Sequence, residues 1–258
     1  MNHYNRAAYG KIGFRCDLGP TNFAEVRQAI SYTIDRARIA ETVTGGYGGI
    51  VHGPYYEDYT AYQAVKDDIK LNPYDYSKER AIEVLTEGGW VYNANGGTFD
   101  PSVDSVRYKK LSGYELSDRN LCYSTEDGRY KTLKINGEYY MPLAINYYGT
   151  RNNEVTDVIV EAWQSNPVAT TDIGAYIQYV DCDFNTGLHG EYHQNQDYGW
   201  DGVAKCTAIN FATTFTSVIY DRYLCWTVNP TFYSDYSSNY LMDEADFYEN
   251  YLSETQDT

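Results

Sequence analysis

Residues 141–148, MPLAINYY, form an apolar run that is typical of a buried β-strand. In residues 155–162 the apolar side chains recur every three or four positions, which predicts one face of a helix. Residues 175–180, AYIQYV, again have the pattern of a strand. A strand, a helix and a strand within about 40 residues predict a βαβ unit whose two strands run parallel. The central prediction is therefore a mixed α/β (α+β) fold with helices flanking a sheet.

Further elements are predicted on both sides of this unit. Residues 206–215 indicate a third strand, and residues 243–252 a short acidic helix. Asn136-Gly137 predicts a tight hairpin turn between strands at 130–135 and 138–148.

The first 45 residues predict two helices. In residues 22–34 the apolar positions share one helical face, and Thr21 or Asn22 could cap the start. Asp35 is the expected cap of a second helix over residues 36–44. Residues 10–16 alternate in the manner of a strand.

A third well-defined helix is expected after Ser77, whose hydroxyl can accept from an early amide, and Gly88-Gly89 should end it. A shorter helix is expected near residues 62–66, inside a long Tyr-rich and Gly-rich stretch.

Composition excludes several classes of protein. The chain has 258 residues, 43% hydrophobic, and a formal charge of −16, which disfavours nucleic acid and anionic membrane surfaces as partners. No stretch approaches 18 consecutive apolar residues, and the first residues lack the apolar run of a signal peptide. The five cysteines contain no C-x-x-C pair and are expected to be mostly buried, unpaired thiols.

No enzyme signature is found. His189 and His193 have the i, i+4 spacing of zinc-protease ligands, but Glu191 is one residue late and Gly190 weakens a helix. Such pairs also arise by chance on solvated faces, so no metal, no cofactor and no catalytic residue is predicted. A metal-dependent hydrolase using the two histidines is the weakest alternative.

Several separate motifs resemble one family. The stretch EVRQAISYTIDR, residues 25–36, is similar to the helix pair of family 5 extracellular solute-binding proteins, the oligopeptide, dipeptide and nickel receptors of ABC importers. The resemblance continues through the glycines of residues 45–54. It resumes at residues 74–90, where the tyrosine, the capped helix and the final Gly-Trp match, and it fits residues 141–180 and 205–215.

This resemblance implies a type II periplasmic-binding-protein-like lobe. Members of the family are about twice as long as this chain, with two α/β lobes, and the matching motifs belong to their C-terminal lobe. Residues 1–258 are therefore expected to form a single domain, the second lobe, with the N-terminal lobe absent.

The ligand cleft is expected at the carboxyl ends of the sheet strands, where open α/β sheets bind ligands. The predicted ligand-binding residues are Tyr147, Tyr148, Thr150, Asn152, Asn210, Thr213 and Thr214. Ordinary packing between helix and sheet is the competing interpretation for the tyrosines, and β propensity the competing interpretation for the two threonines of the third strand.

One departure from the family bears on the ligand. Peptide-binding relatives carry a Trp and then an Asp that pairs with the free amino group of the peptide, whereas Thr213 and Thr216 occupy those places here. Tyr-rich neutral walls would also suit sugars, which stack on aromatic rings.

The resemblance implies a non-catalytic component of an ABC importer, capturing a peptide or another small solute, with an oligosaccharide as an alternative. Its partners would be that ligand and, through the full-length protein, the permease. The parent protein is expected outside the cell membrane, as a lipoprotein or a periplasmic protein, without direct membrane insertion of this segment. A ligand-sensing receptor without an import role is a further alternative.

Overall fold

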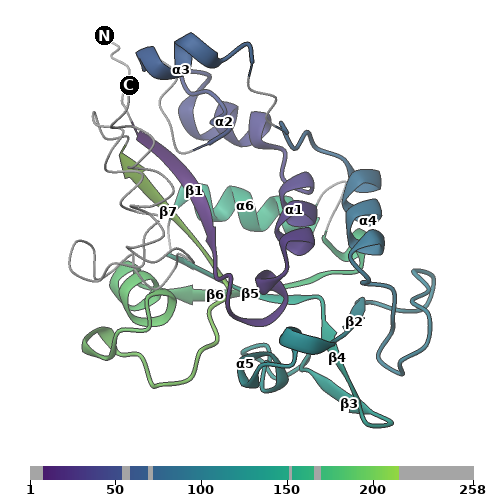
Figure 1. Cartoon of the computed structure of the whole chain (residues 1–258). Helices are drawn as coiled ribbons and strands as arrows, with labels where there is room; N and C mark the ends of the chain where they lie inside the picture. The colour runs from purple at the N-terminus through teal and green to yellow at the C-terminus, as the bar shows by residue number, and fades with distance from the viewer. Residues whose placement is uncertain (1–7, 54–58, 69–71, 151–152, 166–169, 215–258) are drawn as a thin grey trace, which may run out of the picture. The chain divides into compact units, whose positions relative to one another are not determined.

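The computed structural model describes residues 8–53, 59–68, 72–150, 153–165 and 170–214. The chain divides into two units, and Figure 1 labels the helices and strands. One unit takes residues 11–52 and 71–211 and contains nearly all the described elements; the other takes residues 1–10, 53–70 and 212–258. The helix predicted at residues 243–252 lies outside the described residues.

The main sheet has four strands: β1 (Ala8–Phe14), β5 (Ala144–Thr150), β6 (Tyr176–Cys182) and β7 (Ala208–Thr214). Their order is β1-β7-β5-β6. β5 runs parallel to β6, from Ala144 opposite Tyr176 to Thr150 opposite Cys182, and it also runs parallel to β7. The predicted βαβ unit is therefore confirmed.

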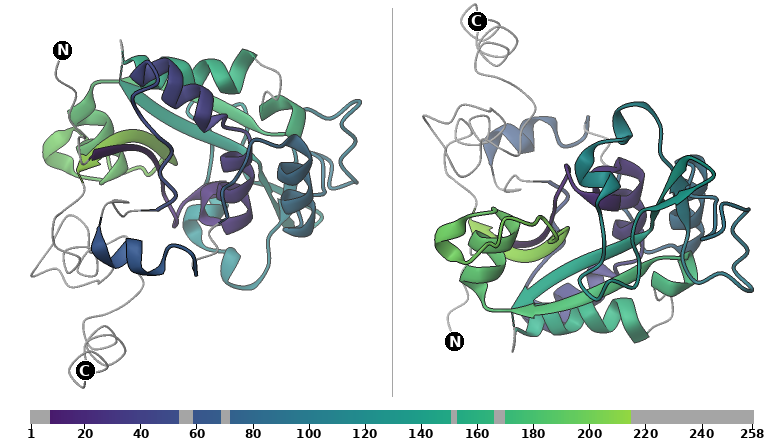
Figure 2. Two further views of the ribbon diagram at one scale, coloured as in Figure 1. Left: turned by 90° about the horizontal axis from the view of Figure 1, so that it is seen from above. Right: turned by 90° about the horizontal axis from the view of Figure 1, so that it is seen from below.

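Helix α6 (Glu154–Ser165) connects β5 to β6 and lies along one face of these two strands (Figure 2). The other face of β5 is covered as well, because every residue from Ala144 to Gly149 is buried. A strand buried on both faces needs a continuous apolar run and not an alternating one, which explains the sequence pattern.

The expected single strand over residues 138–148 is wrong. The structure divides it into β4 (Glu138–Pro142), which pairs antiparallel with β2 (Tyr108–Lys110) and β3 (Leu133–Ile135), and β5 of the main sheet. The change of partners occurs at Leu143. Its amide donates to Arg107 O at 2.7 Å, while its carbonyl accepts from Tyr176 N at 2.9 Å. One residue thus joins two sheets, which no periodicity reveals.

Helices α1 (Ala24–Tyr32) and α4 (Lys78–Glu87) pack against each other (Figure 1). The apolar face of α1 is fully buried, as predicted. The predicted cap of α1 is wrong, because Phe23 occupies the cap position without a side-chain hydrogen bond. A turn of 3₁₀-helix, η1 (Gly19–Asn22), fills the place where Thr21 or Asn22 was expected to cap.

Two other helix caps are confirmed. Asp35 accepts from Arg38 N at 3.0 Å at the start of α2 (Arg36–Thr44), which ends at Gly45 with a φ of 61°. Ser77 accepts from Arg80 N at 3.2 Å at the start of α4.

The remaining described helices are short. They are α3 (Thr60–Val65) in the smaller unit, near the predicted position, and, in the larger unit, η2 (Gly113–Glu115), α5 (Asp118–Leu121), η3 (Thr170–Ile173), η4 (Asn185–Tyr192) and η5 (Gln196–Tyr198).

The four cysteines in the described ranges hold free thiols, as expected. The expectation that most are buried is wrong, since Cys206 is buried, Cys182 is half-buried, and Cys16 and Cys122 are exposed.

Candidate ligand-binding site

The candidate residues Tyr147, Tyr148 and Thr150 of β5 lie towards the edge of the main sheet at which the parallel strands β5 and β6 end. β5 ends at Thr150, opposite the last residue of β6, Cys182. Tyr147 of β5 lies opposite Ala208, the first residue of β7. Open sheets of parallel strands bind ligands outside this edge, because the loops that follow the strands meet there. This edge is therefore the candidate binding region.

Tyr147 faces helix α6 and belongs to the core. Its ring meets Trp163 edge to face, with centroids 4.9 Å apart. Its hydroxyl donates to Asn210 Oδ1 at 2.8 Å, and the Thr156 hydroxyl donates to the same oxygen at 3.0 Å. Tyr147 is 0% exposed and Asn210 is 8% exposed, and burial raises the pKa of the Tyr147 phenol. The structure brings these two predicted residues together, but as a closed internal network.

Tyr148 points to the opposite face of the sheet, as strand alternation requires. It packs beside Leu188 and Tyr192 in a second small core. Its hydroxyl donates to Glu126 Oε1, and Glu126 Oε2 lies 3.3 Å from Lys205 Nζ. Burial, with this hydrogen bond, raises the pKa of Tyr148. The hydroxyl is thus already committed to a neighbouring carboxylate.

The carboxylate of Glu191 lies close to that of Glu126. Burial, together with the charges of Asp201 and Glu126, raises the pKa of Glu191, and Lys205 opposes this shift. This side of η4 therefore carries more negative than positive charge.

The other predicted site residues are only partly described. Thr150 is half-buried at the end of β5. Asn152 lies outside the described residues, and Thr213 and Thr214 belong to β7 without a described side chain. Their role in binding stays a prediction.

Helix η4, which follows β6 at the candidate edge, was not predicted from the sequence. Gly190 was expected to weaken a helix here, but the close packing of η4 against Tyr198 requires a glycine at this position. A Cβ on Gly190 would lie 2.6 Å from Tyr198 O, and one on Gly187 would lie 2.5 Å from Cys182 Sγ. Gly187 and Gly190 were the available signal, since glycine lets a side chain or a second backbone approach closely.

Two exposed aromatic rings lie beside His189 of η4. Phe184 is 47% exposed and Tyr198 is 44% exposed. The His189 ring lies between them, with centroids 6.1 Å from Phe184 and 5.0 Å from Tyr198. Large rings left in water near the ligand edge of a sheet are candidates for stacking on a ligand.

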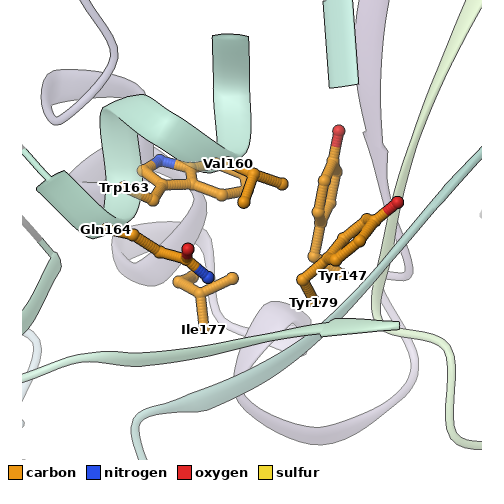
Figure 3. Close-up of a pocket in the computed structure, with 6 residues that line it drawn as sticks. All are labelled: Tyr147, Val160, Trp163, Gln164, Ile177 and Tyr179. Atoms are coloured by element: carbon orange, nitrogen blue, oxygen red, sulfur yellow. The ribbon is translucent and has the colours of Figure 1, made fainter. Parts of the chain in front are cut away.

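A small hollow between α6 and the sheet does not hold a ligand. Figure 3 shows the residues that line it: Tyr147, Val160, Trp163, Gln164, Ile177 and Tyr179. These side chains leave no enclosed space for a water molecule. Trp163 Nε1 is buried without a hydrogen-bond partner, although its ring is well packed. The hollow is a packing defect of the helix–sheet interface.

No group of three His, Cys, Asp or Glu side chains suited to a metal ion occurs in the described parts of the chain. Within the same parts, no helix is both long enough and apolar enough to cross a membrane.

The Gly89-Trp90 pair that follows α4 has a structural role. Trp90 is 0% exposed, its ring lies 5.5 Å from that of Phe23, and its Nε1 donates to Glu25 Oε1 at 3.3 Å. A Cβ on Gly88 would lie 2.3 Å from Glu25 Cγ, so the chain must pass α1 without a side chain there. This motif attaches α4 to α1, away from the strand ends.

Comparison with known proteins identifies the fold. The chain matches the model for bacterial extracellular solute-binding proteins, family 5 Middle, over residues 2–170. No curated protein matches the chain.

Three solved structures are similar in fold. NikZ from Campylobacter jejuni in complex with Ni(L-His) has a TM-score of 0.56 at 14% identity, over 98% of this chain and 39% of that one. The oligopeptide-binding protein AppA from Bacillus subtilis, in complex with a nonapeptide, has a TM-score of 0.55 at 17% identity, over 93% and 38%. NikA from Brucella suis in complex with Fe(III)-EDTA has a TM-score of 0.53 at 14% identity, over 97% and 37%.

The chain thus spans well under half the length of these solved relatives. The mixed α/β architecture predicted from the sequence agrees with theirs. Since the family model covers well over half of the 258 residues, the chain belongs to family 5 of the bacterial extracellular solute-binding proteins.

Proposed function

We propose that this chain is the C-terminal lobe of a solute-binding protein that delivers a small solute to an ABC importer. The match to the family 5 model over residues 2–170 carries this proposal. The order of parallel strands supports it, because β5, β6 and β7 direct their carboxyl ends to one edge where a ligand can be held. The protein binds and releases its ligand without catalysis, as solute-binding proteins do.

The binding cycle would be closure of two lobes around the ligand. Contacts made only in the closed state bias the hinge, so the ligand stabilises closure by its differential affinity for the two states. The first lobe would come from the rest of the longer protein, which would act at the outer face of the membrane and deliver the solute to the permease. Lipoprotein anchoring is one way to hold it there.

The ligand contacts of this lobe would come from the loops after the strands. Tyr147 and Asn210 act as internal support, because their polar atoms pair with each other. The half-buried Thr150 and the exposed rings of Phe184 and Tyr198 are better placed to touch a solute.

The solute would be a peptide or another small molecule. Similar structures were solved with a nonapeptide and with Ni(L-His). The neutral rings of Phe184 and Tyr198 could stack on the apolar face of a sugar, so an oligosaccharide is the second candidate.

Calorimetric titration of the full-length protein with short peptides and with oligosaccharides tests this function. We expect saturable one-to-one binding of one class, and a loss of affinity in the double variant Phe184→Ala/Tyr198→Ala. The exposed Tyr114→Ala is the matched control, since Tyr114 is 90% exposed on η2. Binding of neither class, or equal binding in the double variant, would contradict the proposed ligand surface.

A further inference from the structure

Each of the two exposed rings beside His189 directly follows an exposed aspartate. The chain reads Asp183-Phe184 immediately before η4 and Asp197-Tyr198 within η5. The ring of His189 lies between the two aromatic rings, so both pairs belong to one surface. We call these four residues, Asp183, Phe184, Asp197 and Tyr198, the η4–η5 surface.

The charge along this part of the chain has one sign. Residues 152–204 contain no lysine and no arginine. In the described part of the chain, no Lys or Arg forms an ion pair with Asp183 or Asp197. Within this stretch, residues 181–201 carry five carboxylates, those of Asp181, Asp183, Glu191, Asp197 and Asp201.

The cations that approach η4 from other segments are paired elsewhere. Arg15 and Arg119 reach the end of η4, and both pair with Asp17. Lys205 Nζ lies 3.3 Å from Glu126 Oε2. The η4–η5 surface therefore keeps its negative charge, which complements a positively charged ligand group.

The two exposed rings hold no cation of the protein. Elsewhere the chain places a cation over a ring, as with Lys109 Nζ, 4.2 Å from the ring centroid of Phe23. No Lys or Arg of the described residues makes such a contact with Phe184 or Tyr198. A ring face attracts a cation through its quadrupole, and a neighbouring carboxylate adds Coulomb attraction.

We propose that the η4–η5 surface binds the cationic side chain of a basic peptide, an arginine guanidinium or a lysine ammonium. The guanidinium is the better fit, because its plane can stack on a ring while its N–H groups reach a carboxylate. Asp183 directly follows Cys182, the last residue of β6, so the surface begins at the candidate edge. This inference rests on the proposed binding function and narrows its solute to basic peptides.

Calorimetric titration of the full-length protein with two matched peptides tests the inference. The peptides Ala-Arg-Ala and Ala-citrulline-Ala have nearly the same shape and differ by one positive charge. We expect the arginine peptide to bind on the order of threefold to tenfold more tightly at low ionic strength. Raising the salt concentration to about 0.5 M should reduce this preference, because exposed charges are screened.

The variant Asp183→Asn/Asp197→Asn removes the charge and retains the shape. Asparagine at position 183 can still accept from Thr186 N, which lies 3.0 Å from Asp183 Oδ1. We expect this variant to lose the preference for arginine and to bind the citrulline peptide as the parent does. The control Glu41→Gln/Glu87→Gln removes the same charge from exposed positions on α2 and α4 and should keep the preference. Circular dichroism checks that each variant is folded.

The outcomes separate this inference from the proposed function. Equal binding of the two peptides by the parent protein would overturn the inference alone, as would a preference that survives in Asp183→Asn/Asp197→Asn. Binding of an oligosaccharide without either peptide would also overturn it, because the surface would then hold a neutral ligand. No binding of peptide or oligosaccharide would contradict the proposed function and this inference with it.

Discussion

Replacing Asn210 by alanine should destabilise the chain more than removing the Tyr147 hydroxyl, which is one of the two groups that donate to it. Asn210 Oδ1 accepts from both the Tyr147 and the Thr156 hydroxyls, at 2.8 and 3.0 Å, and both donors are 0% exposed. Asn210→Ala leaves two buried hydroxyls without an acceptor, and each orphaned polar group costs about 1–3 kcal/mol. The expected loss in the free energy of unfolding is therefore about 2–6 kcal/mol.

Tyr147→Phe removes one donor and leaves Asn210 Oδ1 paired with Thr156. Its expected cost is about 1 kcal/mol, the net value of a single hydrogen bond. The double variant should lose less than the sum of the two single variants, because the tyrosine hydroxyl can no longer be orphaned. Equilibrium urea unfolding, followed by far-UV circular dichroism, measures all three values. Tyr114→Phe on the exposed η2 is the control and should stay within about 0.5 kcal/mol of the parent chain.

A loss of stability in Asn210→Ala no larger than that in Tyr147→Phe would contradict this hydrogen-bond network. That result would mean that the two hydroxyls are free to turn elsewhere. The Tyr147 hydroxyl would then be available to a solute, as predicted from the sequence, and Tyr147→Phe should lower ligand affinity without a matching loss of stability.

Three further outcomes are expected. Trp90→Ala should lower the free energy of unfolding by about 3–5 kcal/mol, because the ring is fully buried between α1 and α4; a urea midpoint equal to that of the parent chain would contradict this. Glu191→Gln should stabilise the chain at neutral pH, because burial raises the folded-state pKa and the ionised form is disfavoured. In thermal unfolding scans, the parent chain should lose stability as the pH rises from about 4.3, the pKa of glutamate in the unfolded chain, through the raised pKa in the folded chain. The higher stability of Glu191→Gln relative to the parent chain should therefore vanish below about pH 4. Gly187→Ala should cost about 1–3 kcal/mol, because the new methyl would lie 2.5 Å from Cys182 Sγ, whereas Gly49→Ala, with open space around it, should change the urea midpoint little.

The sequence predicted the elements whose signals are local. The βαβ unit follows from apolar periodicity, and the caps at Asp35 and Ser77 follow from side chains that bond amides three residues away. The family resemblance rested on such segments, and the match over residues 2–170 agrees with it.

The sequence could not predict which partner each segment would meet. The strand at residues 138–148 divides at Leu143, since its amide and carbonyl pair with Arg107 and Tyr176 from distant segments. The cap expected from Thr21 or Asn22 was replaced by a 3₁₀ turn, where the Thr21 hydroxyl donates to Leu18 O and to Thr207 O, 186 residues away.

The contacts of the candidate site residues could not be predicted from the sequence either. Strand alternation alone determines that Tyr147 and Tyr148 point to opposite faces. Only the tertiary structure decides that both hydroxyls are occupied, one by Asn210, 63 residues away, and the other by Glu126, 22 residues away. The physical reason is that periodicity and capping act within one or two turns of the chain. Burial and hydrogen-bond pairing depend on what lies on the other side of the sheet.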